Sequence, residues 1–461
     1  MPYFRNIDIM FFTIFYILIL VVTYFNLPAW ACFIFLVGIF FGHIVYRKNN
    51  SLFYPFIIYP FMFMIRATDP DGVLLTILPD VITIVAVIIY ISQFIIKRIT
   101  IRRDRFAFLV LLLMHILVSA SILYCHVYEL LYIPILIRTY FIPLIFLLVI
   151  LHASMKDILI PQIVIRLFVI SISAVAIIAL SQYFNIYKIP SKIGYLQPAA
   201  MVDTNIIVDG DEGPHDFKGT RSTIFAQDVY RINLLTGGSI GSSGAVFVAV
   251  SILCFARLIF GINTLLLYAM GLMCLVAGLL TASTSILIPI SVYLLLKTFS
   301  KIKQSIVWLC ILMFNIVLLI YIVINVQFIE GISPIEYYIS TIGGSIMGVF
   351  KNLKMSYVLF GIGPAILSTK YYFTPEGYII DVGILRVFQE TGFINFLLFF
   401  SFLFGVSFIA LRNIWNKSER IVMLYAFPFF TLVLLVHANY SIVPPFHVLF
   451  AASIAGVLSC K

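Results

Sequence analysis

The stretch LFGIGPAILSTKYYFTPEGYIIDVGILRVFQETGFINFLLFFSFLFGVSFIAL at 359–411 decides how the chain is organised. A glycine-rich turn at 361–364 leads through an aromatic, polar loop to a helical segment that carries Asp381, Arg386 and Glu390, and a long apolar run follows. Ionisable side chains at the mouth of a membrane helix are costly to desolvate unless they line a wet cavity. This stretch is therefore predicted to hold the functional site.

The composition of the whole chain predicts an all-α polytopic integral membrane protein. Of its 461 residues, 63% are hydrophobic and only 10% are charged. Apolar runs of roughly 17 to 25 residues, long enough to cross a bilayer as helices, number about fourteen. Pro55 and Pro60 interrupt one of them, and Thr281–Ser285 either separates two runs or forms a kink or a re-entrant turn. Because the runs take up most of the chain, 1–461 is expected to form a single membrane domain.

Basic residues are concentrated in alternate connections between the apolar runs, and this pattern predicts the orientation of the chain. The basic segment 97–105 and both termini are expected in the cytoplasm. Two long loops then lie outside: the first outer loop at 185–240, and the second outer loop at 327–378, which continues into a helical segment to 390. The same rule accounts for the net charge of +10, so nucleic acid is not an expected partner.

The first outer loop carries ionisable residues close to the start of the next apolar run. Its acidic cluster is typical of a solvated surface loop, although His215 beside it is a candidate base. Arg221 and Arg231 are different, because they precede a helix start at 242–244 among hydrophobic and hydroxyl residues. Arginines beside a helix N-terminus suit an anion such as a phosphate.

Two tyrosine pairs in the second outer loop are candidates for glycan binding, since sugars stack on aromatic rings. The alternative is an aromatic belt at the membrane interface. The residues are Tyr337, Tyr338, Tyr371 and Tyr372.

Arg138, His152 and Arg166 stand out among the ionisable residues within the predicted spans. Such residues are expensive in a bilayer unless they face the interior of the helix bundle. Each is therefore either functional or a core residue satisfied by a partner. Asp80 and Glu129, near the outer ends of spans, are candidate partners.

No motif for nucleotide or metal binding is found in the sequence. The chain lacks GxxxxGK[ST], HExxH and GxSxG, and Gly361-Ile-Gly363 follows no Rossmann strand, so it is interpreted as a turn. We therefore expect no cofactor and no metal. An enzyme at the outer face, where nucleotide substrates are absent, must act on a substrate that already carries its leaving group.

Four segments together resemble the O-antigen polymerase and ligase superfamily, multi-spanning glycosyltransferases that use undecaprenyl-diphosphate-linked saccharides outside the inner membrane. They are Arg231 followed by GGSIGSSGAVFVAVSIL (237–253), LLTASTSILI (279–288), LFGIGPA (359–365) and DVGILRVFQETG (381–392). The resemblance covers the topology of the whole chain and about a fifth of it residue by residue. Their order and their placement beside the outer loops carry the resemblance.

Two features depart from the pattern of that superfamily. The T-x-S-R-like element lacks its arginine, since Thr284 follows Ser283. Asp381 stands where ligases that transfer glycan to lipid A carry a histidine. The first departure leaves diphosphate binding to other arginines, and the candidates are Arg221, Arg231, Arg386 and Arg166.

The resemblance implies a GT-C-like, metal-independent polymerase. It would join undecaprenyl-diphosphate-linked oligosaccharide repeat units into O-antigen or a capsular-type polysaccharide at the periplasmic face of the bacterial inner membrane. It would be surrounded by membrane lipids, and a chain-length regulator protein is an expected partner. Glycosyl transfer needs a base for the attacking hydroxyl. Asp381 is the first candidate, followed by Glu390 and His215.

Three alternatives stay open: a ligase of the same superfamily, a flippase or other transporter of lipid-linked oligosaccharides, and a structural or assembly protein. A transporter would also have many spans and internal arginines, but it would not need two large outer loops with paired basic motifs. The helix geometry also leaves a choice. In a straight helix Asp381 and Arg386 lie roughly 140° apart, so either Gly383 breaks the helix or one of the two is structural.

Overall fold

The computed structural model describes residues 6–25, 28–62, 65, 74–97, 103–125, 137, 141–157, 159–184, 186, 221–224, 227–230, 240–281, 284–306, 355–361, 383–416, 418–434 and 446–460. The first elements are α1 (Asn6–Phe25), α2 (Ala29–Tyr46), the 3₁₀ helix η1 (Lys48–Phe53), α3 (Tyr54–Ile58), η2 (Tyr59–Phe61), α5 (Leu74–Lys97), α6 (Arg103–Cys125), α8 (Ile142–Lys156) and α9 (Leu159–Tyr183). Next come β1 (Arg221–Ile224), β2 (Gln227–Tyr230), α11 (Ile240–Phe255), α12 (Thr264–Leu280), η5 (Thr284–Ile286) and α13 (Leu287–Phe299). The last elements are α16 (Met355–Phe360), α17 (Gly383–Asn416), α18 (Glu419–Leu434) and α19 (Phe446–Ser459).

The described elements are those of a helical membrane protein. Four helices are long and apolar enough to cross a membrane, namely Ala29–Tyr46, Phe106–Cys125, Leu159–Ser181 and Glu390–Asn416. Further apolar helices span 10–17 residues. The expected total of about fourteen spans stays a prediction.

Two of the apolar runs are divided in the structure. The run interrupted by Pro55 and Pro60 folds as η1, α3 and η2 rather than as one long helix, because a proline inside a helix removes a backbone donor and clashes with the preceding turn. Near Thr281 the chain forms two separate helices, since α12 ends at Leu280 and α13 begins at Leu287.

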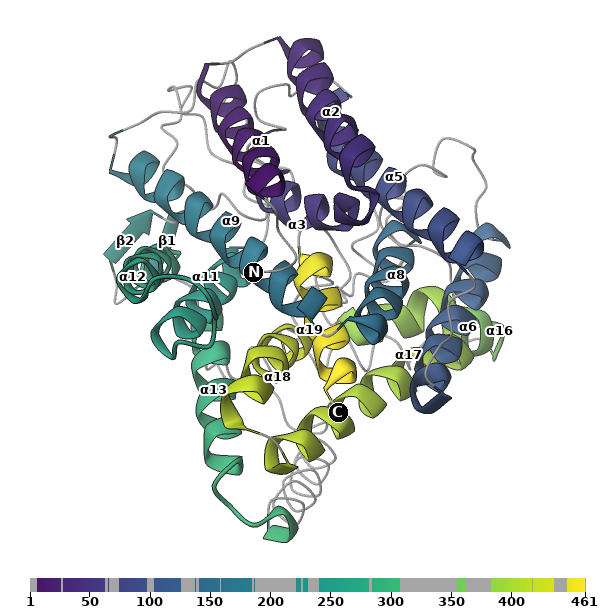
Figure 1. Ribbon diagram of the computed structural model, residues 1–461. Helices are drawn as coiled ribbons and strands as arrows, with labels where there is room; N and C mark the ends of the chain where they lie inside the picture. The colour runs from purple at the N-terminus through teal and green to yellow at the C-terminus, as the bar shows by residue number, and fades with distance from the viewer. Residues whose placement is uncertain are drawn as a thin grey trace, which may run out of the picture.

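Helix α19 lies at the centre of the bundle (Figure 1) and packs against α8, α9, α17 and α18. Its side chains are buried along its whole length. Gly456 allows the close approach of α18, since a Cβ atom at this position would collide with the Tyr425 ring. Helices α1, α2 and α5 group on one side of this centre and α11, α12 and α13 on another.

Hydrogen bonds join helix ends that the charge pattern places together on the cytoplasmic face. The Arg420 guanidinium donates to the Arg257 carbonyl from Nε at 2.9 Å and from Nη2 at 2.6 Å. Trp415 Nε1 donates to the carbonyls of Phe299 at 2.9 Å and Ile302 at 3.1 Å. The turn after α11, the end of α13 and the connection from α17 to α18 are therefore linked.

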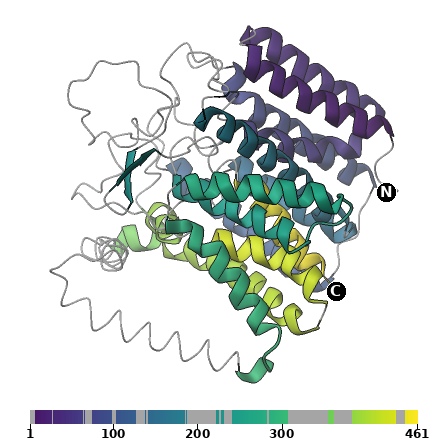
Figure 2. The ribbon, with the colours of Figure 1, turned by 90° about the vertical axis from the view of Figure 1, so that its left-hand side faces the viewer.

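Described parts of the two outer loops lie at one end of the molecule. Figure 2 shows the β1–β2 hairpin, which belongs to the first outer loop, and α16, which belongs to the second, on the same side, at the left of the view. The hairpin adds a small antiparallel sheet to a chain that was expected to be all-α, and it pairs Arg221 with Tyr230. The side of the membrane on which this end lies stays a prediction.

Candidate functional site

Two glycines bring separate parts of the 359–411 stretch into contact. Gly361 follows α16 with φ of +73°, and Gly392 interrupts α17 with φ of 80° and ψ of 175°. A Cβ atom at Gly361 would collide with the Glu390 carbonyl, and one at Gly392 would collide with the Leu359 carbonyl. Each glycine therefore packs against the backbone of the residues that precede the other glycine. A side chain at either position would prevent this close approach. We call this contact between residues 359–361 and 390–392 the joint.

Glu390 lies inside this joint. It is fully buried, in the turn of α17 just before the break, and the backbone of Gly361 covers its carbonyl group. The next residue, Thr391, is also buried, and its hydroxyl donates to the Val387 carbonyl at 2.6 Å. Position 386 is one helical turn before Glu390, so the two positions share a face of the helix.

The helix that carries these positions begins at Gly383. Asp381 comes before it, outside the described residues, so Asp381 and Arg386 are not both on the described helix. The choice that helix geometry left open therefore stays open.

A second close contact joins the other two motif segments. A Cβ atom at Gly244, in the first turns of α11, would collide with the Thr281 hydroxyl at the end of α12. At Gly278 a Cβ atom would lie 2.7 Å from the Val248 side chain. The Thr281 hydroxyl donates to the Gly278 carbonyl at 2.7 Å, and Ser243 is buried beside this contact. Gly244 and Gly278 thus let α11 and α12 pack closely.

The β1–β2 hairpin contains one of the candidate arginines, Arg221. Arg221 is paired with Tyr230 across the two strands, and Arg231 is the residue that follows Tyr230. Opposite residues in an antiparallel pair have Cα atoms about 4.5–5.5 Å apart. The hairpin therefore brings together Arg221 and Tyr230, which are nine positions apart in the sequence.

Arg166 lies apart from these contacts. It is partly buried in α9, between the buried Ile165 and Leu167. It precedes the end of α9 at Tyr183 by 17 residues, or about 26 Å of helix. This distance separates it from the first outer loop, which follows that end.

Several predicted site residues lie outside the described residues. They are Asp381, His215, Arg231, Tyr337, Tyr338, Tyr371 and Tyr372. Arg221 and Arg386 are placed by their backbone alone, in β1 and in the first turn of α17. Of the predicted site residues, the structure therefore describes the side chains of Glu390 and Arg166 and only the backbone of Arg221 and Arg386.

Two intramembrane candidates have tyrosine partners. His152 Nδ1 lies 2.7 Å from the Tyr90 hydroxyl. Asp80 Oδ1 accepts a hydrogen bond from the Tyr59 hydroxyl at 3.0 Å. The first contact agrees with the interpretation of His152 as a core residue satisfied by a partner. Asp80 was expected only as a partner for the residues inside the spans, and the contact described for it is with Tyr59.

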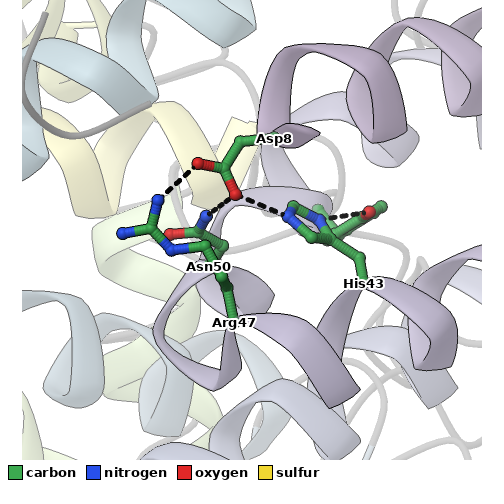
Figure 3. Close-up of polar contacts among 5 residues, drawn as sticks. Asp8, His43, Arg47 and Asn50 are labelled. Atoms are coloured by element: carbon green, nitrogen blue, oxygen red, sulfur yellow. Dashed lines mark hydrogen bonds and ion pairs between the residues drawn. The ribbon is translucent and has the colours of Figure 1, made fainter. Parts of the chain in front are cut away.

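A cluster that the sequence interpretation missed surrounds Asp8 (Figure 3). Asp8 is fully buried and accepts hydrogen bonds from Arg47 Nη1 at 2.6 Å and Asn50 Nδ2 at 2.7 Å. His43 Nε2 lies 2.9 Å from the same carboxylate, and His43 Nδ1 lies 2.8 Å from the Tyr54 hydroxyl. The cluster fastens α1 to α2 and to η1. A signal was present, because His43 and Arg47 are four residues apart and so share one face of the helix end.

No group of three or more His, Cys, Asp and Glu side chains is placed to hold a metal ion within the described ranges. No protein-family model, curated protein or solved structure matches the chain.

Proposed function

We propose that the chain is a glycosyltransferase that joins undecaprenyl-diphosphate-linked oligosaccharide repeat units into a surface polysaccharide, as an O-antigen polymerase does. The observation that supports this most directly is the joint of Gly361 and Gly392 around the buried Glu390. It connects two of the four segments on which the resemblance rests. A rigid joint at the mouth of an apolar helix suits the positioning of a charged substrate.

The proposed reaction forms one glycosidic bond and breaks another bond at the same anomeric carbon. A hydroxyl of the acceptor glycan attacks that carbon, its proton passes to a carboxylate, and the bond to the lipid diphosphate breaks with its electron pair leaving on the diphosphate. Asp381 is the first candidate for the base and Glu390 the second. The buried position of Glu390 also suits a role in holding neighbouring groups in place.

Arginines would neutralise the charge that develops on the leaving diphosphate. A guanidinium is permanently charged and can hold two phosphate oxygens at once. Arg221 and Arg231 are the favoured pair, because both precede a helix start in the sequence, and arginines beside a helix N-terminus suit a phosphate. Arg386 is the third, since it shares a helix face with Glu390. Arg166 is the least favoured, given its distance from the end of α9.

The proposal includes a GT-C-like arrangement of about fourteen spans in a bacterial inner membrane, with both outer loops in the periplasm. The links of Arg420 to Arg257 and of Trp415 to Phe299 agree with this topology, since each joins two connections that it places on the cytoplasmic face. The common position of the hairpin and α16 in Figure 2 agrees with a shared outer face.

Reconstitution tests the activity directly. The purified protein in liposomes, supplied with lipid-diphosphate repeat units and no nucleotide or metal, should lengthen the glycans. Asp381→Asn removes a proton acceptor with little change of shape, and Arg231→Lys keeps charge but loses the bidentate geometry, so both should reduce elongation strongly. Glu419→Gln is the matched control, because Glu419 is an exposed carboxylate at the start of α18 and is not among the predicted site residues.

The same assay distinguishes the alternatives. Movement of the lipid-linked substrate across the bilayer without elongation would favour a transporter. Transfer of the glycan to a lipid A acceptor but not to another repeat unit would favour a ligase. Full elongation by both variants would remove Asp381 and Arg231 from the reaction.

A further inference from the structure

A group of basic residues gathers where several helices end on the predicted cytoplasmic face. All six are exposed, and we call them the basic corner: Arg257, Lys297, Lys301, Lys303, Arg412 and Arg420. Within the described part of the chain, none of the six forms an ion pair. A positive surface without acidic partners attracts anions.

Contacts between helices hold the basic corner together. Arg420, in the first turn of α18, donates to the Arg257 carbonyl and lies over the Phe260 ring at 4.7 Å from its centroid. Trp415 Nε1 ties the end of α17 to the end of α13 through the Phe299 carbonyl. The basic side chains are therefore attached to well-packed helix ends rather than to separate loops.

Arg257 occupies a position where glycine is the usual residue. The amide of Leu258 donates to the Leu253 carbonyl at 2.9 Å, and the amide of Arg257 donates to the Cys254 carbonyl at 3.0 Å, which is the pattern of a Schellman motif that ends α11. Arg257 takes the left-handed conformation that this motif requires, with φ of 52°. A side chain makes that conformation less favourable than glycine does, so the backbone gives no reason for an arginine here.

The side chain of Arg257 is held in a defined place. Its Nε and Nη2 donate to the Tyr268 hydroxyl at 2.9 and 2.6 Å, and its ring contact with Tyr268 measures 5.3 Å to the centroid. Arg420 likewise uses Nε and Nη2 on the Arg257 carbonyl. Within the described residues, Nη1 of each guanidinium has no protein acceptor. The Nη1 groups of Arg257 and Arg420 are therefore available to donate hydrogen bonds to an anion.

We propose that the basic corner binds the headgroup of an anionic phospholipid, with Arg257 and Arg420 holding its phosphate. Charge complementarity favours this ligand, and so does the position of the site at the ends of apolar helices, where lipid headgroups lie. Trp415 supports the placement, since tryptophan is enriched at this level of a membrane. The proposal rests on membrane embedding and is independent of the proposed glycosyl transfer.

The test compares lipids and variants of the purified full chain. Native mass spectrometry counts retained lipid, and thermal unfolding measures stabilisation, as phosphatidylglycerol or phosphatidylcholine with the same acyl chains is added. Phosphatidylglycerol should be retained and should raise the unfolding temperature of the parent protein more than phosphatidylcholine does. Arg257→Gly and Arg420→Gln should each weaken this binding about fivefold, the factor for one basic charge at a membrane surface.

Two controls keep the result interpretable. Arg257→Gly suits the left-handed backbone, so this variant should fold even where Arg420→Gln does not. Lys354→Gln removes the same charge from the second outer loop and should bind lipid like the parent. Equal retention of phosphatidylglycerol by Arg257→Gly and the parent would overturn the proposal. So would equal stabilisation by free inorganic phosphate, or binding of a short RNA in preference to the lipid.

Discussion

Replacing Gly392 by alanine is expected to destabilise the protein by about 2–6 kcal/mol in total. A backbone with φ of 80° and ψ of 175° is almost restricted to glycine, and holding alanine there costs about 1–3 kcal/mol. The new methyl group would also meet the Leu359 carbonyl, and relieving such an overlap costs about 1–3 kcal/mol more. The joint with the turn after α16 should then open.

The measurement is unfolding of the purified protein in mixed micelles, with glycan elongation as the second readout. Gly38→Ala is the matched control, because Gly38 lies exposed in α2 with no atom within 4 Å of an added Cβ. This control should change stability by about 1 kcal/mol or less and leave elongation unchanged. If Gly392→Ala were as stable as Gly38→Ala and made chains of the same length, the joint would have no structural or functional role.

Two further predictions concern orientation and the N-terminal cluster. Reporter fusions at Lys218 and Lys354 should show both outer loops on the periplasmic side, and cytoplasmic activity at either position would contradict the topology. Asp8→Ala should lower the free energy of unfolding by about 3 kcal/mol. This value is at the low end for a broken buried ion pair, because the Arg47 side chain is 29% exposed and water can solvate it. The control is Glu419→Ala, which removes an exposed carboxylate and should change the free energy of unfolding by about 0.5 kcal/mol or less. Equal losses in the two variants would mean that the Asp8 cluster adds no stability.

The sequence predicts the class of fold because apolar runs of span length and the distribution of basic residues are local signals. It also predicts the interruption at Pro55 and Pro60 for a local reason, the missing backbone donor. It does not predict which helices are in contact. The hydrophobic pattern therefore did not indicate that α19 lies at the centre or which helices surround it. Among membrane helices, small residues and shape decide the partner more than hydrophobicity does.

In the candidate site, too, the local features could be predicted and the contacts between distant segments could not. The turn at Gly361 and the ionisable character of Glu390 could be predicted from the sequence, since both are properties of a single residue in its neighbourhood. The contact between Gly361 and Gly392 could not, because about thirty positions separate them and only the folded backbone brings them together. The spacing of His43 and Arg47 was a local signal for part of the Asp8 cluster, but their contacts with Asp8 in α1 and with Asn50 in η1 depend on the folded backbone.

The central position of α19 has a consequence for biosynthesis. This helix leaves the ribosome after every helix against which it packs, so the earlier spans must wait in the membrane with their shared centre unfilled. During that interval the Tyr59 ring lacks the edge-on contact of His447, whose ring centroid lies 4.4 Å away in the finished fold. The Ser154 carbonyl likewise lacks the hydroxyl of Ser459. A nascent chain stalled before α19 would therefore expose polar surface to lipid or to insertion factors, and the insertion of α19 would be the step that closes the bundle.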